Sequence, residues 1–259
     1  MKRRNYKHYI RKSHRYLGVF IGIQFVFWTV GGLYFSWTNI KEIRGDHLRK
    51  ESEQSIRLDQ PLISPQTAAE KLLASSRASS ISKIRLIDLF GAPHYEIGYR
   101  TSGGEELAVA NAVTGEIRNA ITEDEAKQIA SEAMRSPQPV KSVVYITKEN
   151  VGGHHEYREK PLPAWAVSFE NTDNLTVYLS AQTGQIGAFR TGNWRIFDFL
   201  WMLHTMDFQE RDNINNYLLR AFSALGIVTL FSGFLLFFVS SRFWRRLLWK
   251  RPDSVMIVE

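Results

Sequence analysis

The distribution of apolar and polar positions separates two long apolar runs from a central region of mixed character. The first run, Tyr16 to Trp37, and the second, Leu218 to Val239, are each 22 residues long, and Arg220 is the only charged residue in either. About 20 apolar residues carry a helix across a bilayer. We therefore expect membrane-spanning helices at residues 16–38 and 217–240, with the side chain of Arg220 extended toward the membrane surface.

Two other interpretations would explain these runs without a membrane span. A signal peptide has an apolar region of about 7–15 residues and a small-residue cleavage site, but the first run is longer and LYFSWTNIKE contains no such site. A buried core helix is the alternative for the second run. The length of both runs, and the aromatic residues near their ends, favour true spans.

The central region contains one pattern twice. The first copy, residues 61–119, begins with ISPQTAAEKLLASS and closes with ELAVANAVTGEI; the second, residues 120–192, begins with ITEDEAKQIASEAM and closes with LTVYLSAQTGQI. Each copy has a helix N-cap residue, apolar residues at helical spacing, strand-like alternation and a Thr-Gly turn, which predict one helix over a small antiparallel sheet. The second copy is longer by about 11 residues, which we place in a surface loop at 148–163.

The formal net charge of +7 is concentrated at the two ends of the chain. Residues 1–15 hold seven Lys or Arg and no acid, residues 242–259 hold five more, and the region between holds 21 bases against 24 acids. This distribution does not favour nucleic acid as a partner. Because basic flanks stay on the cytoplasmic side of a bilayer, we expect cytoplasmic tails at 1–15 and 241–259. A linker at 39–60 and an interfacial segment at 193–216 complete the division of the chain.

Some kinds of chemistry have no support in the sequence. The chain has no cysteine, so it offers neither a disulfide nor a thiolate metal site. It also lacks the motifs G-x-S-x-G, H-E-x-x-H and G-x-x-x-x-G-K-[ST]. We therefore predict no catalytic residues of a hydrolase.

Several segments resemble one family. The opening I-[ST]-x-x-x-A and the closing T-G-[EQ]-[IV] of each copy resemble the PepSY repeat, whereas RKSHRYLG at 11–18 and LHT at 203–205 resemble PepSY-associated transmembrane proteins. The resemblance covers residues 11 to about 246. It implies a membrane α plus α+β fold in the bacterial inner membrane, with both termini cytoplasmic and two transmembrane helices flanking a periplasmic tandem of PepSY-like units.

The resemblance also implies a function. Several members are linked to iron and siderophore uptake, and larger members with four or more spans are haem-containing reductases; this chain has two spans and no nucleotide-binding motif. We expect an accessory or haem-containing electron-transfer component of iron uptake and, if it is an enzyme, a component of a haem-dependent ferric or siderophore reductase. A non-redox, protein-binding regulator of a protease or envelope partner is the alternative. Periplasmic copper handling is the third hypothesis.

Histidines beside the two spans are the candidate cofactor ligands. His14, Gly18 and Gly22 share one helical face, which either binds a flat haem b or packs against the small residues at 226–233 of the second span. His204 precedes the second span on the outer side. Because the bilayer core separates the two histidines by about 30 Å, one iron cannot bind both, and a bis-histidine haem requires a homodimer or another partner protein.

The copper hypothesis places the metal ligands at the outer surface of the membrane. Met202, His204 and Met206 would align on an extended segment, whereas on a helix His204 points away from the two methionines. Packing is the alternative role for these methionines. His47, just beyond the first span, could meet His204 as a further metal ligand.

Carboxylates could support these ligands. Asp46 and Asp207 stand beside His47 and near His204 in the sequence, where they could orient the imidazoles. We expect structural roles for the remaining histidines outside the tails: His94 in a strand, and His154 and His155 in the solvated loop.

Overall fold

The computed structural model describes residues 6–50, 56, 60–76, 78–152, 155–158 and 160–241. The chain divides into two compact units: the first comprises Met1–Trp37 and Asp198–Glu259, and the second comprises Thr38–Phe197. The two apolar runs belong to the first unit. Both copies of the repeated pattern lie entirely within the second unit.

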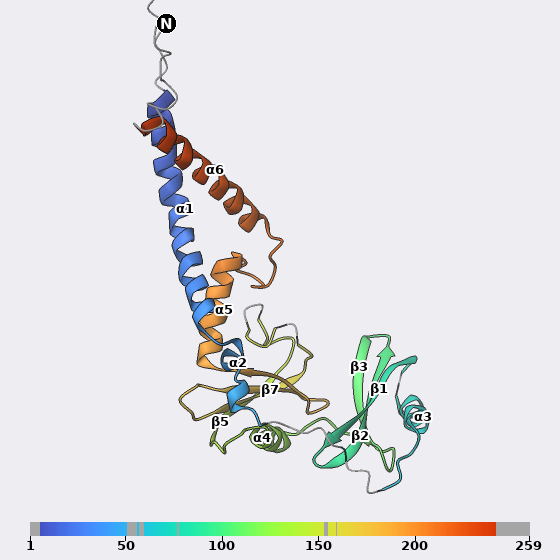
Figure 1. Cartoon of the computed structure of the whole chain (residues 1–259). Coiled ribbons are helices and arrows are strands. Elements are labelled where there is room, and N and C mark those ends of the chain that lie inside the picture. The colour runs from blue at the N-terminus through green and yellow to red at the C-terminus, as the bar shows by residue number, and fades with distance from the viewer. Residues whose placement is uncertain are drawn as a thin grey trace, which may run out of the picture. The chain divides into compact units, whose positions relative to one another are not determined.

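Two long helices dominate the first unit. α1 (Tyr6–Trp37) and α6 (Tyr217–Ser240) are long and apolar enough to cross a membrane, and they pack against each other (Figure 1). Only 6% of the most apolar window of α6 is buried. A core helix would be covered by other elements, so this exposure excludes the buried-helix interpretation and fits a surface that faces lipid.

Part of the predicted N-terminal basic tail and part of the predicted interfacial segment are helical. α1 begins at Tyr6, earlier than the predicted start of the span, because the Lys and Arg residues of this segment are good helix formers. α5 (Gly192–Thr205) begins in the second unit and ends in the first. It leads from the last strand toward the loop that precedes α6.

Small residues on α6 make the contact between the two long helices. A Cβ added to Gly226 would lie 3.7 Å from the ring of Phe25, and one added to Gly233 would lie 3.2 Å from Cε1 of His14. On α1, three glycines have no atom within 4 Å of an added Cβ: Gly18, Gly22 and Gly32. The prediction that Gly18 and Gly22 pack against the second span is therefore wrong, because larger α1 side chains fill the space beside the α6 glycines.

Each half of the second unit contains one helix and one four-stranded antiparallel sheet, as predicted for each copy. α3 (Pro65–Ser75) packs on the sheet β1–β2–β3–β4, and α4 (Glu123–Glu132) packs on the sheet β5–β6–β7–β8 (Figure 1). The strands are β1 (Ser80–Leu89), β2 (Ala92–Thr101), β3 (Gly104–Asn111), β4 (Ile117–Arg118), β5 (Val140–Ile146), β6 (Ala164–Phe169), β7 (Thr176–Ser180) and β8 (Ile186–Arg190).

The two halves share a hydrophobic core. The larger core lies between α4 and the second sheet, and it also contains Leu89 and Val109 of the first sheet. A smaller core around Ile97 lies between α3 and the first sheet. Burial of apolar surface across both halves stabilises them as one body, which agrees with their assignment to one compact unit.

The segment that follows α1 is held against the second sheet. α2 (Ile40–Ile43) and η1 (Asp46–Leu48) lead into a bridge in which the N–H of Arg135 donates to the carbonyl of Leu48 at 2.8 Å. The hydroxyl of Thr191, just after β8, donates to the carbonyl of Ile43 at 3.1 Å. The predicted linker is therefore an ordered part of the second unit over residues 39–50.

Candidate functional site

His14 lies in the contact between α1 and α6. Its Nδ1 is 2.7 Å from Oγ of Ser232, and Oγ of Ser232 donates its proton to the carbonyl of Thr229 at 2.8 Å. In the tautomer that carries its proton on Nδ1, His14 donates to the serine oxygen, whose own proton goes to Thr229. That tautomer keeps the lone pair of Nε2 for a ligand.

His204 lies at the end of α5 against aromatic side chains of α1. Its ring stacks on Trp201 with centroids 6.0 Å apart, and it meets Trp28 and Phe35 at 6.1 Å each. Nε1–H of Trp28 donates to the carbonyl of His204 at 3.0 Å. The ring is nonetheless exposed on its remaining side, so the aromatic residues position the imidazole without enclosing it.

The structure does not bring His14 and His204 together. His204 contacts Trp28, which follows His14 by 14 residues on the same helix. At about 1.5 Å per residue this separation is about 21 Å along the axis. One metal ion within a single chain cannot bind both imidazoles, since metal–nitrogen bonds are about 2 Å long.

The copper ligands are also separated. α5 is helical through Thr205, so Met202 and His204 project in different directions. Met206 is buried beyond the end of the helix, with φ +53°. The extended arrangement that copper binding required is absent, and the described residues contain no group of three or more His, Asp or Glu placed to hold a metal ion.

Asp207 caps a turn and does not orient a histidine. Its carboxylate accepts N–H groups from Gln209 and Glu210 at 3.2 Å and from Asn213 at 2.9 Å. Burial alone would raise the pKa of Asp207, but these backbone donors outweigh it and lower the pKa. The predicted role of Asp207 beside an imidazole is therefore wrong, since the turn after α5 uses its oxygens.

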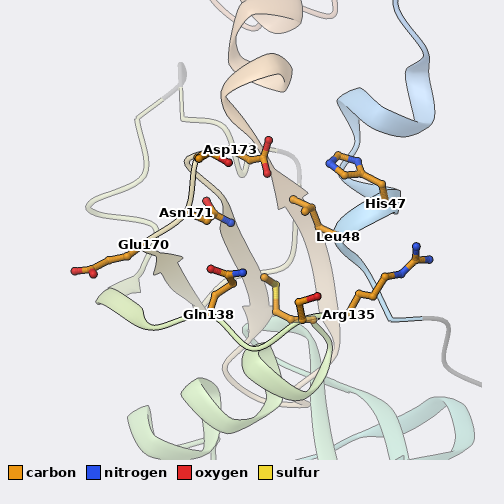
Figure 2. Close-up of a pocket in the computed structure, with 10 residues that line it drawn as sticks. His47, Leu48, Arg135, Gln138, Glu170, Asn171 and Asp173 are labelled. Atoms are coloured by element: carbon orange, nitrogen blue, oxygen red, sulfur yellow. The ribbon is translucent and has the colours of Figure 1, made fainter.

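His47 lines a cleft at one end of the second sheet. The cleft has a volume of about 390 Å³, and Figure 2 shows the residues around it. Its lining comes from three segments: His47 and Leu48; Met134, Arg135, Ser136 and Gln138; and Glu170, Asn171, Thr172 and Asp173. His47 belongs to the second unit and His204 to the first, so their predicted meeting as metal ligands stays a prediction.

The inserted loop between β5 and β6 is exposed at residues 148–150, 152 and 160–161, as predicted for a surface loop, but it also docks on the second sheet through Glu156. Its carboxylate accepts from Nε and a terminal nitrogen of Arg195 at 2.7 and 2.8 Å, and from the hydroxyl of Tyr178 at 2.6 Å. Its carbonyl accepts from Nε of Arg190 at 3.0 Å. Burial and the bond to Glu156 raise the pKa of Tyr178, and burial lowers that of Arg190 to about 10.

Aromatic contacts complete the attachment of the inserted loop to the second sheet, which we call the anchor of the loop. The anchor was not predicted from the sequence. Tyr157 is buried and stacks on Tyr178 with centroids 4.9 Å apart, and the guanidinium of Arg190 lies 3.9 Å from the ring centroid of Trp194. The presence of a tyrosine in an otherwise charged loop is the feature of the sequence that could have indicated this attachment. The loop therefore joins the sheet to the first turn of α5.

The remaining histidines have local roles where the structure describes them. Nδ1 of His94 is 2.9 Å from the carbonyl of Ala92 in the first sheet, and the ring is buried. Nδ1 of His155 accepts from the N–H of Tyr157 at 3.1 Å. His154 lies outside the described residues.

Comparison with known proteins identifies the family. A family model described as the PepSY-associated TM region matches residues 11–255. Comparison with curated proteins and with solved structures gives no match. Because the family match includes both apolar helices and the whole unit between them, this chain is a membrane protein that belongs to the PepSY-associated TM region family.

Proposed function

We propose that this protein is an inner-membrane, haem-containing electron-transfer component of iron or siderophore uptake, in which His14 is a haem ligand. Both termini are cytoplasmic in this proposal, and the second unit is periplasmic. The basic terminal segments and the membership of the PepSY-associated TM region family support the orientation. The observation that carries the proposal is the hydrogen-bond chain from His14 through Ser232 to Thr229.

This chain of hydrogen bonds fits a ligand histidine. Metal-binding histidines generally donate their second ring N–H to a nearby acceptor, which sets the tautomer and the orientation of the ring. Ser232 supplies that acceptor to His14, and the bond crosses from one apolar helix to the other. A merely polar surface histidine needs no such arrangement.

The donor set fits half of a bis-histidine haem site. His14 supplies one imidazole, and a second copy of the chain supplies the other in a homodimer. Gly18 and Gly22, one and two turns from His14, have no atom within 4 Å of an added Cβ, which leaves room for a flat ligand or a second helix. A bound haem would supply one-electron transfer; the chain's own residues hold and orient it.

A spectrum of the full-length protein tests this function. After haem-replete expression and purification in detergent, we expect a Soret band that shifts on reduction, and His14→Ala should lose more than half of that absorbance. Ser232→Ala keeps the imidazole but loses its orientation, so haem affinity should fall about 10–100-fold. His8→Ala, an exposed histidine on the same helix, is the matched control and should retain the band.

Two results would contradict the proposal. One is a folded wild-type protein with no haem absorbance, which would favour the non-redox regulator instead. The other is undiminished absorbance in His14→Ala. His204→Ala should be examined in parallel, because a dimer related by a two-fold axis would also place two His204 rings on the opposite side of the membrane.

A further inference from the structure

We propose that Arg190, together with Arg44 and Arg158, binds a phosphate group on the second unit. The three guanidinium groups come from three segments, namely β8, the turn after α2 and the inserted loop. The site lies wholly within the second unit and does not depend on haem at His14. It rests on the contacts among the three segments, on the partners of Arg190 and on the local excess of positive charge.

The turn that carries Arg44 is fixed against the end of β8. The hydroxyl of Thr191, the residue after Arg190, donates to the carbonyl of Ile43 at 3.1 Å. A Cβ added to Gly45 would lie 3.3 Å from Cγ2 of the same threonine. Since Ile43 and Gly45 flank Arg44, both neighbours of this arginine lie against the residue that follows Arg190.

The inserted loop brings Arg158 to the same end of the sheet and orients Arg190. Nε of Arg190 donates to the carbonyl of Glu156, two residues before Arg158, at 3.0 Å. One terminal nitrogen donates to the carbonyl of Phe189 at 3.4 Å, and the guanidinium lies 3.9 Å from the ring centroid of Trp194. The other terminal nitrogen has no acceptor among the described residues, and the side chain is partly exposed, so this nitrogen remains available to a ligand.

The positive charge of Arg190 is not balanced by a carboxylate of the described residues, since both of its hydrogen bonds go to backbone carbonyls. The carboxylate of Glu156 binds Arg195 through both of its oxygens, at 2.7 and 2.8 Å, so its charge is already balanced. Arg44 is exposed and forms no ion pair with a described residue. The site therefore carries an excess of positive charge.

This excess of charge acts on the protonation of Arg190. Burial is the main cause that lowers its pKa to about 10; the carboxylate of Glu156 opposes the decrease, and the charges of Arg158 and Arg44 add to it. A bound anion would favour the charged form and so offset both the burial and the repulsion. Because a pKa of about 10 leaves Arg190 protonated at pH 7, the guanidinium can pair with an anion there.

A phosphate group suits guanidinium groups that come from three segments. Arginine binds phosphate and carboxylate oxygens through paired N–H donors. The oxygens of a phosphate point in several directions, whereas those of a carboxylate lie in one plane, so phosphate can meet more than one guanidinium at once. Arg44 follows Trp37, the end of α1, by seven positions, and Arg190 precedes α5 by two. A phospholipid headgroup and free inorganic phosphate are therefore the two sources to distinguish.

Calorimetry with the full-length protein in a non-ionic detergent tests the proposal with two probes, inorganic phosphate and dihexanoylphosphatidylglycerol. We expect wild type to bind at least one of them saturably. Arg44→Gln and Arg190→Gln should each bind that probe about tenfold more weakly, as for loss of a charged hydrogen bond. Binding of phosphate as tight as that of the lipid identifies the free ion as the ligand, whereas tighter binding of the lipid identifies the headgroup.

Two comparisons separate recognition from damage to the fold. Arg190→Gln also loses the bond to the carbonyl of Glu156, so Arg44→Gln, which changes an exposed side chain, is the decisive variant. Arg100→Gln removes an exposed arginine of β2 in the other half of the unit and should leave the affinity unchanged. The proposal is overturned if neither probe binds wild type saturably up to about 10 mM. It is also overturned if Arg44→Gln binds as tightly as Arg100→Gln.

Discussion

At the scale of single residues, two glycines show how a short motif sets a turn. Gly115 and Gly184 end the Thr-Gly motifs of the two copies, and their φ angles are +76° and +70°. A side chain at these angles costs about 1–2 kcal/mol. At Gly184 a Cβ would also lie 2.9 Å from Cδ1 of Ile129 on α4 and 3.1 Å from Cδ1 of Leu89. The predicted turns are confirmed, and glycine additionally allows the turn to approach the shared core.

The anchor of the inserted loop predicts a pH dependence. Burial and the hydrogen bond to Glu156 raise the pKa of Tyr178, so the folded state holds this proton more tightly than the unfolded state. The resulting stabilisation is complete below pH 10, near the unfolded pKa, and is lost as the pH rises toward the folded value. Wild type should lose about 1.4 kcal/mol per pH unit above pH 10 from this group. Tyr178→Phe should lack that contribution, and should cost about 1–3 kcal/mol at pH 7.

Urea denaturation of the detergent-solubilised protein, followed by tryptophan fluorescence at pH 7 and pH 11, measures both effects. Tyr145→Phe is the matched control, since this exposed tyrosine of β5 has no hydroxyl bond to Glu156. If Tyr178→Phe and wild type lose equal stability between the two pH values, the assignment to Tyr178 is wrong.

At the scale of elements, local patterns predicted what local interactions determine. Ser64 and Thr122 were expected as N-caps; Oγ of Ser64 accepts from the N–H of Thr67, and Thr122 forms a capping box with Glu125. The apolar runs likewise predicted α1 and α6, because the length and composition of such a run are local properties of the sequence. Of the two faces through which these helices pack, only that of α6 was predicted correctly. A glycine pattern shows where a helix can be approached closely, but it does not show which residues of another helix pack there.

The contact between α1 and α6 predicts unequal tolerance of its glycines. Gly233→Leu would force the ring of His14 away from α6, since even a Cβ lies 3.2 Å from that ring. Overpacking of this kind costs about 1–3 kcal/mol. In a protein of this size we expect the Tm of the detergent-solubilised chain to fall by about 2–10 °C.

Gly32→Leu on α1 is the matched control, because no atom lies within 4 Å of an added Cβ there. Its Tm should stay within about 2 °C of wild type, as for a surface substitution. Equal losses in the two variants would mean that Gly233 does not face His14. A loss in Gly32→Leu alone would place a second helix on the α1 face that the single chain leaves open.

At the scale of the whole molecule, long-range contacts explain what the sequence could not reveal. His47 and Asn171 line one cleft although 124 positions separate them. Glu156 meets Arg195 although three strands, β6, β7 and β8, lie between them in the sequence. No periodicity links such residues, since one member of each pair, Asn171 or Glu156, lies in an irregular segment. The charge of KENVGGHHEYREKPLP indicated solvent exposure, whereas its position above the second sheet gave Glu156 two arginine partners.

The orientation of the chain in the membrane can be measured by labelling single introduced cysteines, because the chain has no cysteine of its own. Basic flanks resist translocation, so Ser13, which lies among Lys and Arg residues, should face the cytoplasm, and Ser102, in the turn between β2 and β3, should face the periplasm. In intact spheroplasts a membrane-impermeant maleimide should label Ser102→Cys and leave Ser13→Cys unlabelled until the membrane is permeabilised. Both residues are exposed, so protection within the fold does not account for a difference between them. Labelling of Ser13→Cys in intact spheroplasts, or of Ser102→Cys only after permeabilisation, would reverse the orientation and move His14 to the outer side.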